Sequence, residues 1–160
     1  MSDPIRRVVT GFGDDGAPTV LFDGPAPAVV ELPPEVGATL VDLWRSDAVP
    51  LDTVSSADAT TADFALMPAG SLFRVIDLAP GTAAPLWHTT ASVDCTYVAH
   101  GAVTVLIGAE GGPVTEVDLA AGDTFVHRGP RHAWVNRSTG PCRLVCTSIA
   151  ATLPEGVEPG

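Results

Sequence analysis

The chain has 160 residues and a mass of 16.4 kDa, enough for one domain that buries a core without disulfides. Apolar residues make up 46% and charged residues 17%, a composition typical of folded proteins rather than disordered ones. The net charge of −11 comes from 19 acidic residues against 8 arginines, with no lysine. We therefore expect neither nucleic acid nor an anionic membrane as a partner. No apolar run reaches membrane-spanning length, and the start lacks the apolar stretch of a signal peptide, which indicates a cytoplasmic protein.

Short β-branched runs separated by glycine and proline turns indicate an all-β fold. The expected strands are residues 6–10, 19–22, 38–45, 71–78, 93–99, 102–107, 114–119, 123–128, 132–136 and 142–150. Residues 36–44 also have the apolar spacing of a helix, but Gly37 and the β-branched Thr39 and Val41 favour a strand. Residues 46–68 have little periodicity and many turn formers, and they are predicted to be a long loop.

All four histidines lie between positions 88 and 132. The surrounding sequence reads PGTAAPLWHTTASVDCTYVAHG over residues 80–101 and GDTFVHRGPRHAWVN over residues 122–136. These stretches resemble the two sequence motifs of the cupin superfamily. The resemblance implies a double-stranded β-helix, or jelly-roll, barrel with an N-terminal β arm. We expect the arm at residues 1–70, the barrel at 71–150 and a tail at 151–160.

The two motifs match the family pattern place by place. The first motif has two histidines, a glutamate and a glycine, and here these places hold His88, Thr90, Asp94 and Gly101. The second has two glycines, a histidine and an asparagine, here Gly122, Gly129, His132 and Asn136, the last being the only asparagine of the chain. Threonine in place of the second histidine and aspartate in place of glutamate depart from the usual four-ligand metal site.

The resemblance implies one divalent metal ion inside the barrel, bound by His88, Asp94 and His132. His127 falls where cupins place an inward residue near the metal, and we expect it as a fourth ligand because Thr90 has no ring nitrogen. Imidazoles with a carboxylate suit Fe, Zn, Ni or Mn, and the ligands alone do not select among them.

Strand parity extends this hypothesis, because side chains two residues apart point the same way. If Asp94 points into the barrel, then Cys95 and Tyr97 point out of it, into the space between sheet and arm. Phe125 and His127 share one face. We expect Asp94 or His127 to move a proton.

Other residues near the motifs have simpler expected roles. Thr90, Phe125 and Arg128 are expected to line a substrate pocket, with Arg128 at the mouth facing an anionic group or solvent. His100 precedes a turn and is expected to be solvated rather than a ligand.

The tryptophans and cysteines are expected to be structural. Trp87 and Trp134 flank the motif histidines and are predicted to pack on the outer face of the barrel. Cys95, Cys142 and Cys146 have no metal-binding or disulfide spacing, so buried reduced thiols are expected.

Three functions stay open, because cupins host many activities on one fold. The first is a metal-dependent lyase or isomerase that decarboxylates, dehydrates or cyclises a small organic or polyketide-like substrate. The second is an Fe(II)-dependent dioxygenase, and the third is a non-catalytic cupin that binds a small ligand. The long N-terminal arm also predicts a homodimer, because such arms cover or pair with a neighbour's sheet edge.

Overall fold

The computed structural model describes residues 4–48, 50, 53, 55–60, 70–82, 84–108 and 111–160. Among these residues it has eleven strands and no helix, so no described helix is long and apolar enough to cross a membrane. The strands are β1 Arg6–Phe12, β2 Pro18–Pro25, β3 Ala28–Glu31, β4 Ala38–Ser46, β5 Ser71–Leu78, β6 Ser92–His100, β7 Ala102–Gly108, β8 Val114–Ala120, β9 Thr124–His127, β10 His132–Val135 and β11 Cys142–Ala150.

The all-β prediction is confirmed, and each of the ten expected strands is present with its ends shifted by three residues or fewer. Residues 38–46 form the strand β4, as the β-branched Thr39 and Val41 predicted, and not the helix that the apolar spacing of residues 36–44 also allowed. The sequence prediction missed β3, a four-residue strand set between prolines. The predicted loop at 46–68 lies largely outside the described residues.

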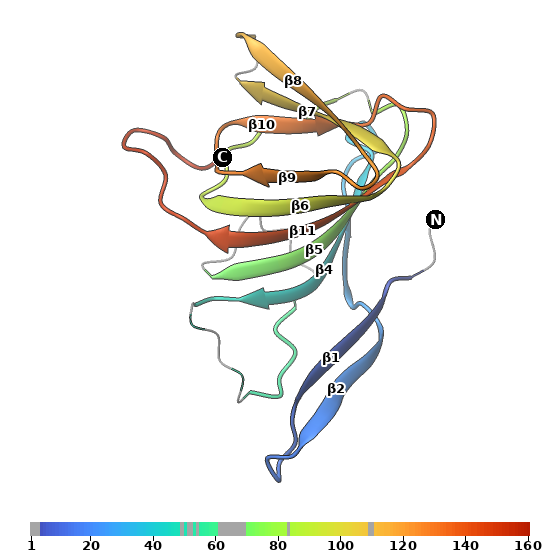
Figure 1. Cartoon of the computed structure of the whole chain (residues 1–160), viewed down its shortest axis with the longest axis vertical. Coiled ribbons are helices and arrows are strands. Elements are labelled where there is room, and N and C mark those ends of the chain that lie inside the picture. Colours follow the sequence, from blue (N-terminus) through green and yellow to red (C-terminus); the bar gives the residue numbers. More distant parts are fainter. Residues whose placement is uncertain are drawn as a thin grey trace.

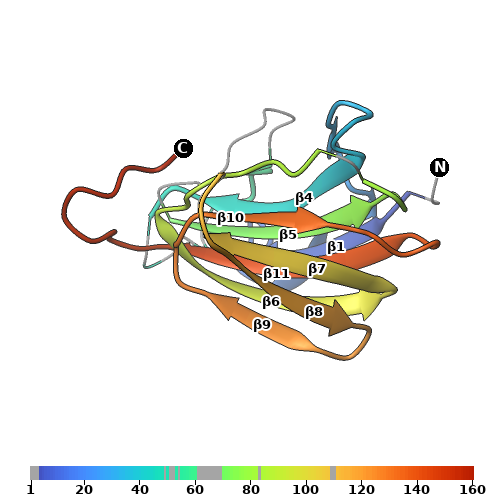
Figure 2. The same ribbon diagram turned by 90° about the horizontal axis from the view of Figure 1, so that it is seen from above.

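The strands form three antiparallel sheets (Figure 1). The largest has six strands in the order β3-β4-β5-β11-β6-β9, and a second has three in the order β10-β7-β8. β1 and β2 pair only with each other and form a hairpin that extends away from the barrel. Figure 2 shows the six-stranded and three-stranded sheets as two curved layers around a common interior.

The main core lies between these two layers. Its buried residues come from both sheets: Ala38, Leu78, Val98, Cys142 and Leu144 on one side, and Val103, Val105 and Leu119 on the other. Burying one such valine or leucine contributes about 1.5–3 kcal/mol, so this core holds the layers together.

A tight turn joins β6 to β7 at Gly101. Its φ is 77°, and a Cβ atom there would lie 2.3 Å from the carbonyl oxygen of Pro141. Only glycine fits both the left-handed backbone and the close approach, which explains the motif glycine at this place.

The N-terminal part of the chain contributes to the barrel as well as to the hairpin. β3 and β4 belong to the six-stranded sheet, and β4 pairs with β5 along its length. The side chain of Arg7, in the hairpin, forms an ion pair with Asp58 and donates to the carbonyl oxygen of Leu43. The expected boundaries at 70 and 150 stay a prediction about domain organisation.

Candidate functional site

Three histidines meet where the two barrel sheets join. His127 ends β9 of the six-stranded sheet, and His132 begins β10 of the three-stranded sheet. His88 pairs with His132 through two backbone hydrogen bonds of 2.9 Å. The turn between β9 and β10 requires Gly129, whose φ is 92° and whose added Cβ would lie 2.7 Å from the Thr90 carbonyl oxygen.

The three imidazole rings are in contact. The ring centroid of His132 lies 4.2 Å from the ring centroid of His88 and 3.8 Å from that of His127. Because a carbonyl oxygen only accepts, each ring nitrogen bonded to one carries its proton. Nδ1 of His88 donates to the Leu86 carbonyl oxygen at 2.9 Å. Nδ1 of His132 and Nε2 of His127 donate to the Pro130 carbonyl oxygen at 3.1 and 2.9 Å.

Burial keeps the three rings neutral at neutral pH. Burial and then the neighbouring His88 and His127, beside which a second positive charge is unfavourable, together lower the pKa of His132 to about 3. Burial also lowers the pKa of His88 and of His127, while the charge of Asp94 acts in the opposite direction on both. Each neutral ring therefore keeps one unprotonated nitrogen, the form that binds metal ions.

Asp94 points into the barrel beside these rings, the position from which strand parity places Cys95 and Tyr97 on the outside. It is buried, and it lies directly opposite His127 in the pairing of β6 with β9. Its carboxylate accepts hydrogen bonds from the hydroxyls of Ser92 at 2.7 Å and Thr90 at 3.3 Å. These two donors hold the carboxylate in one orientation.

The three imidazoles expected to bind a metal ion are therefore neutral, and each has one unprotonated ring nitrogen. They lie on neighbouring elements, and His88, His127 and His132 are in ring contact. Within the described residues, no group of three or more His, Cys, Asp or Glu side chains has converged on a common point that could hold an ion. The structure thus brings the expected ligands together without showing a closed coordination sphere.

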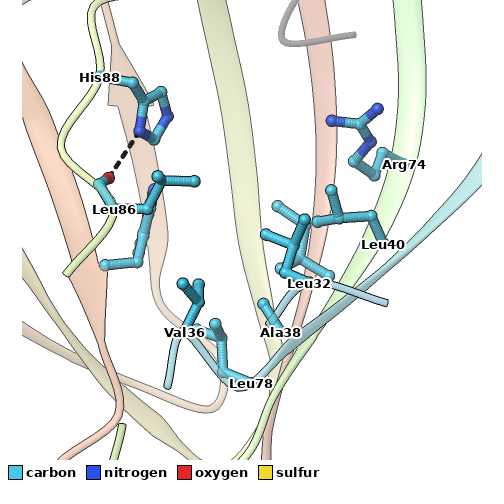
Figure 3. A pocket seen from close by; sticks show the side chains of 10 residues that line it. Leu32, Val36, Ala38, Leu40, Arg74, Leu78, Leu86 and His88 are labelled. Atoms are coloured by element: carbon cyan, nitrogen blue, oxygen red, sulfur yellow. Dashed lines mark hydrogen bonds between the residues drawn. The ribbon is translucent and has the colours of Figure 1, made fainter. Parts of the chain in front are cut away.

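An apolar cavity of about 90 Å³ lies beside this cluster (Figure 3). His88 and Arg74 are its two polar lining residues, and Trp134 lines it too. The remaining walls are aliphatic: Leu32, Val36, Ala38, Leu40, Ile76, Leu78 and Leu86. Apolar walls with few polar groups are the lining typical of small-molecule sites, but the volume is below the roughly 300–1,000 Å³ of such sites, so this cavity would hold only a small group.

Arg74 and Asp42 form a buried ion pair at the cavity. They lie directly opposite each other on β5 and β4, and both the Nε and Nη2 groups of Arg74 donate to the Asp42 carboxylate. Sequence analysis did not single out either residue. The signal was available, because Arg74 interrupts an alternating inward row of Leu72, Ile76 and Leu78.

The predicted substrate-pocket residues lie elsewhere around the cluster. Thr90 is buried against Asp94, and Phe125 stacks on His127 with ring centroids 5.7 Å apart. Arg128 is exposed on the turn after β9. None of the three lines the cavity of Figure 3. His100 is exposed at the end of β6, apart from the three clustered histidines.

The prediction that Trp134 packs on the outer face is wrong. Trp134 lies two residues after His132 on β10, so the two side chains share the inward face. Its ring lines the cavity and packs edge-on against Phe125 at 5.6 Å. Trp87 does pack away from the cluster, against Leu106, Ala133 and Val135.

Two expectations for β6 also need correction. Cys95 and Tyr97 point out of the barrel as predicted, but both are exposed rather than covered by the arm. Cys95 is therefore not a buried thiol, whereas Cys142 and Cys146 are buried. Burial raises the pKa of Cys142 to about 11, which keeps that thiol protonated.

Comparison with known proteins identifies the family of this chain. The sequence model of the cupin domain family matches residues 74–148, which contain the histidine cluster. The chain belongs to the cupin superfamily. It is 31% identical over 116 residues to phomopsin biosynthesis cluster protein D of Diaporthe leptostromiformis, a match covering 68% of this chain and 59% of that protein. It is 28% identical over 141 residues to oryzines biosynthesis cluster protein J of Aspergillus oryzae, covering 84% of this chain and 75% of that protein.

Solved cupin structures have the same fold at low sequence identity. The cupin domain of Schizosaccharomyces pombe Cnp3 has a TM-score of 0.56 at 13% identity, covering 94% of this chain and 89% of that one. Hydroxypropylphosphonic acid epoxidase from S. wedmorenis has a TM-score of 0.52 at 15% identity, covering 70% of this chain and 51% of that one. These similarities show a shared cupin barrel.

Proposed function

We propose that this chain is a metal-dependent cupin enzyme of the lyase or isomerase type, acting on a small organic substrate in a biosynthetic pathway. The observation that carries the proposal is the contact of three neutral imidazoles next to an apolar cavity. Named relatives from two biosynthesis clusters support a role in tailoring a small molecule.

The unprotonated ring nitrogens decide which atoms would bind the metal. They are Nε2 of His88 and His132 and Nδ1 of His127, because the other nitrogen of each ring donates to a carbonyl. Such second bonds fix the tautomer of metal-binding histidines. Asp94 would complete the ligand set. When bound, the ion would supply a Lewis acid for a carbonyl or carboxylate oxygen.

The protein itself would bind the substrate and handle the proton. The aliphatic walls would exclude water from a small apolar group of the substrate, and the reacting group of the substrate would lie at the end of the cavity lined by His88. His127 is neutral and buried, so its Nδ1 can accept a proton only where that nitrogen is not itself a ligand of the ion. Ser92 and Thr90 would hold Asp94 in place as the second group able to carry that proton.

Elemental analysis of the purified protein tests the metal. We expect about one divalent ion per chain in the wild type and its loss in the double variant His88→Ala, His132→Ala. The matched control is His100→Ala, which removes an exposed histidine away from the cluster and should keep the ion. Full loading of the double variant would contradict the proposed ligands.

The reaction type is tested by turnover with and without oxygen on a panel of aromatic acids and β-keto acids. Product formation under strict anaerobiosis with zinc, nickel or manganese bound supports the lyase or isomerase proposal. Oxygen consumption that matches product formation, in iron-loaded protein only, would establish the dioxygenase instead. Ligand binding without turnover would support the third function, a non-catalytic cupin that binds a small ligand.

A further inference from the structure

The inner face of the six-stranded sheet changes from polar to apolar along its strands. One inward row crosses four neighbouring strands, β4, β5, β11 and β6, and all its side chains are buried: Asp42, Arg74, Cys146 and Thr96. Thr96 lies two residues after Asp94, so this row borders the candidate site. The next inward row on the same strands is aliphatic: Leu40, Ile76, Leu144 and Val98. A ligand that contacts both rows would need one polar end and one apolar end.

Arg74 is the cation of the polar row, and its side chain lines the cavity. Figure 3 shows its guanidinium directed from β5 toward the interior, with His88 on the opposite side of the cavity. Charged side chains are almost never buried in this way unless they are paired. The planar fork of N–H groups on a guanidinium matches the two oxygens of a carboxylate. This wall of the cavity is therefore suited to a carboxylate.

The carboxylate of Asp42 holds the guanidinium in place. It accepts from Nε of Arg74 at 2.5 Å and from Nη2 at 3.1 Å. A guanidinium carries five N–H groups, so one arginine can serve more than one acceptor. Taking both charges out of water is unfavourable, and an apolar pair of similar volume is often as stable as a buried ion pair. The stability of the barrel alone therefore does not explain why these two charges are inside it.

We propose that Arg74 binds the carboxylate of the substrate, and that the substrate is a small organic acid whose apolar part lies against the aliphatic row. This inference rests on the proposed function, because it takes the same cavity as the place of reaction. The carboxylate would lie at Arg74 and the reacting group at His88, and the volume of about 90 Å³ limits the part between them to a small group. Asp42 competes with the substrate for the guanidinium.

Binding of propanoate tests the inference, with propanamide as a neutral probe of the same shape. The indole signal of Trp134 in an NMR titration reports on the cavity, because this ring lines it, and Trp134→Phe assigns the signal. Chelator-treated protein is used beside zinc-loaded protein, so that binding to an ion is separated from binding to Arg74. We expect saturable binding of propanoate in both samples, and binding of propanamide that is roughly tenfold weaker or absent.

Asp42→Asn distinguishes ligand binding from a purely structural ion pair. It removes the competing anion at nearly constant size, so propanoate should bind roughly threefold more tightly or better and should raise the Tm by more than in the wild type. A purely structural pair predicts no such gain.

The double variant Asp42→Leu, Arg74→Met removes both charges and leaves neither one unpaired. Circular dichroism should report a folded barrel, and propanoate should bind roughly tenfold more weakly or not at all. The matched control is the double variant Glu116→Gln, Arg137→Gln, which removes an exposed ion pair and should leave propanoate binding unchanged.

Equal binding of propanoate by the wild type and by the folded Asp42→Leu, Arg74→Met variant would overturn the inference. Absence of propanoate binding to the wild type up to about 100 mM would overturn it as well. These outcomes are separate from those of the proposed function. Binding that requires Arg74 in chelator-treated protein would stand even if elemental analysis found no ion, whereas normal metal loading with binding independent of Arg74 would overturn only this inference.

Discussion

At the scale of single residues, the three clustered histidines make the stability of the fold depend on pH. An unfolded histidine ionises near pH 6.5, whereas the pKa of His132 in the fold is about 3. Between these values the unfolded chain binds more protons than the folded chain, so the free energy of unfolding rises with pH. This stability is complete above about pH 6.5 and is lost as the pH falls toward 3.

We therefore predict that the metal-free protein, kept in a chelator, loses roughly 2 kcal/mol of stability between about pH 7.5 and pH 5 through His132. Urea unfolding at both pH values measures it. Other groups also titrate in this range, so the informative quantity is the difference from His132→Gln, which should have the smaller pH dependence. An equal pH dependence in both proteins would show that His132 does not titrate as its burial requires.

At the scale of elements, Asn136 joins the end of β10 to the start of β11. Its side-chain NH₂ donates to the carbonyl oxygens of Leu78 and Gly140, and its oxygen accepts from the backbone and hydroxyl of Ser138. The residue is fully buried, and all four of its hydrogen-bonding positions are used. The motif asparagine thus has a structural role in holding this connection.

We predict that Asn136→Asp lowers the free energy of unfolding by roughly 3 kcal/mol or more, because a carboxylate cannot donate to two buried carbonyl oxygens. Ser138→Ala removes only one hydroxyl of the same turn, and it should cost about 1 kcal/mol. Urea unfolding of both variants beside the wild type gives the comparison. Similar losses in the two variants would mean that the amide donors contribute little.

The strands were predictable because one face of each barrel strand is buried, which imposes a period of two on its sequence. β5 and β11 were predicted to the residue. β3 was missed because four residues between prolines are too few to establish a period. Trp134 was misplaced although parity with His132 was sufficient to place it on the inward face.

The candidate site was predictable in part. Motif spacing identified His88, His127, His132 and Asp94 as neighbours, and the structure brings the three rings into contact. The cavity walls were not predictable, because Leu32 and Arg74 lie far from the motifs in sequence and reach His88 only through sheet order. Spacing along a chain reports local strands and turns, whereas a cavity depends on which strands become neighbours.

At the scale of the whole molecule, the charge of the chain opposes its association. Two copies that each carry −11 would repel each other in the homodimer that the N-terminal arm predicts, whereas Phe73, Tyr97 and Val126, exposed on the outer face of the six-stranded sheet, offer an apolar contact. Salt screens the repulsion: the Debye length falls from about 20 Å at 20 mM to about 6 Å at 300 mM. The apolar contact is not weakened by the same change in salt.

We therefore predict that the dimer tightens with salt, its dissociation constant falling roughly threefold or more between about 20 and 300 mM NaCl. Sedimentation equilibrium over a range of protein concentrations measures the constant at each salt concentration. A dissociation constant that rises with salt would mean that ion pairs, rather than apolar side chains, hold the two copies together.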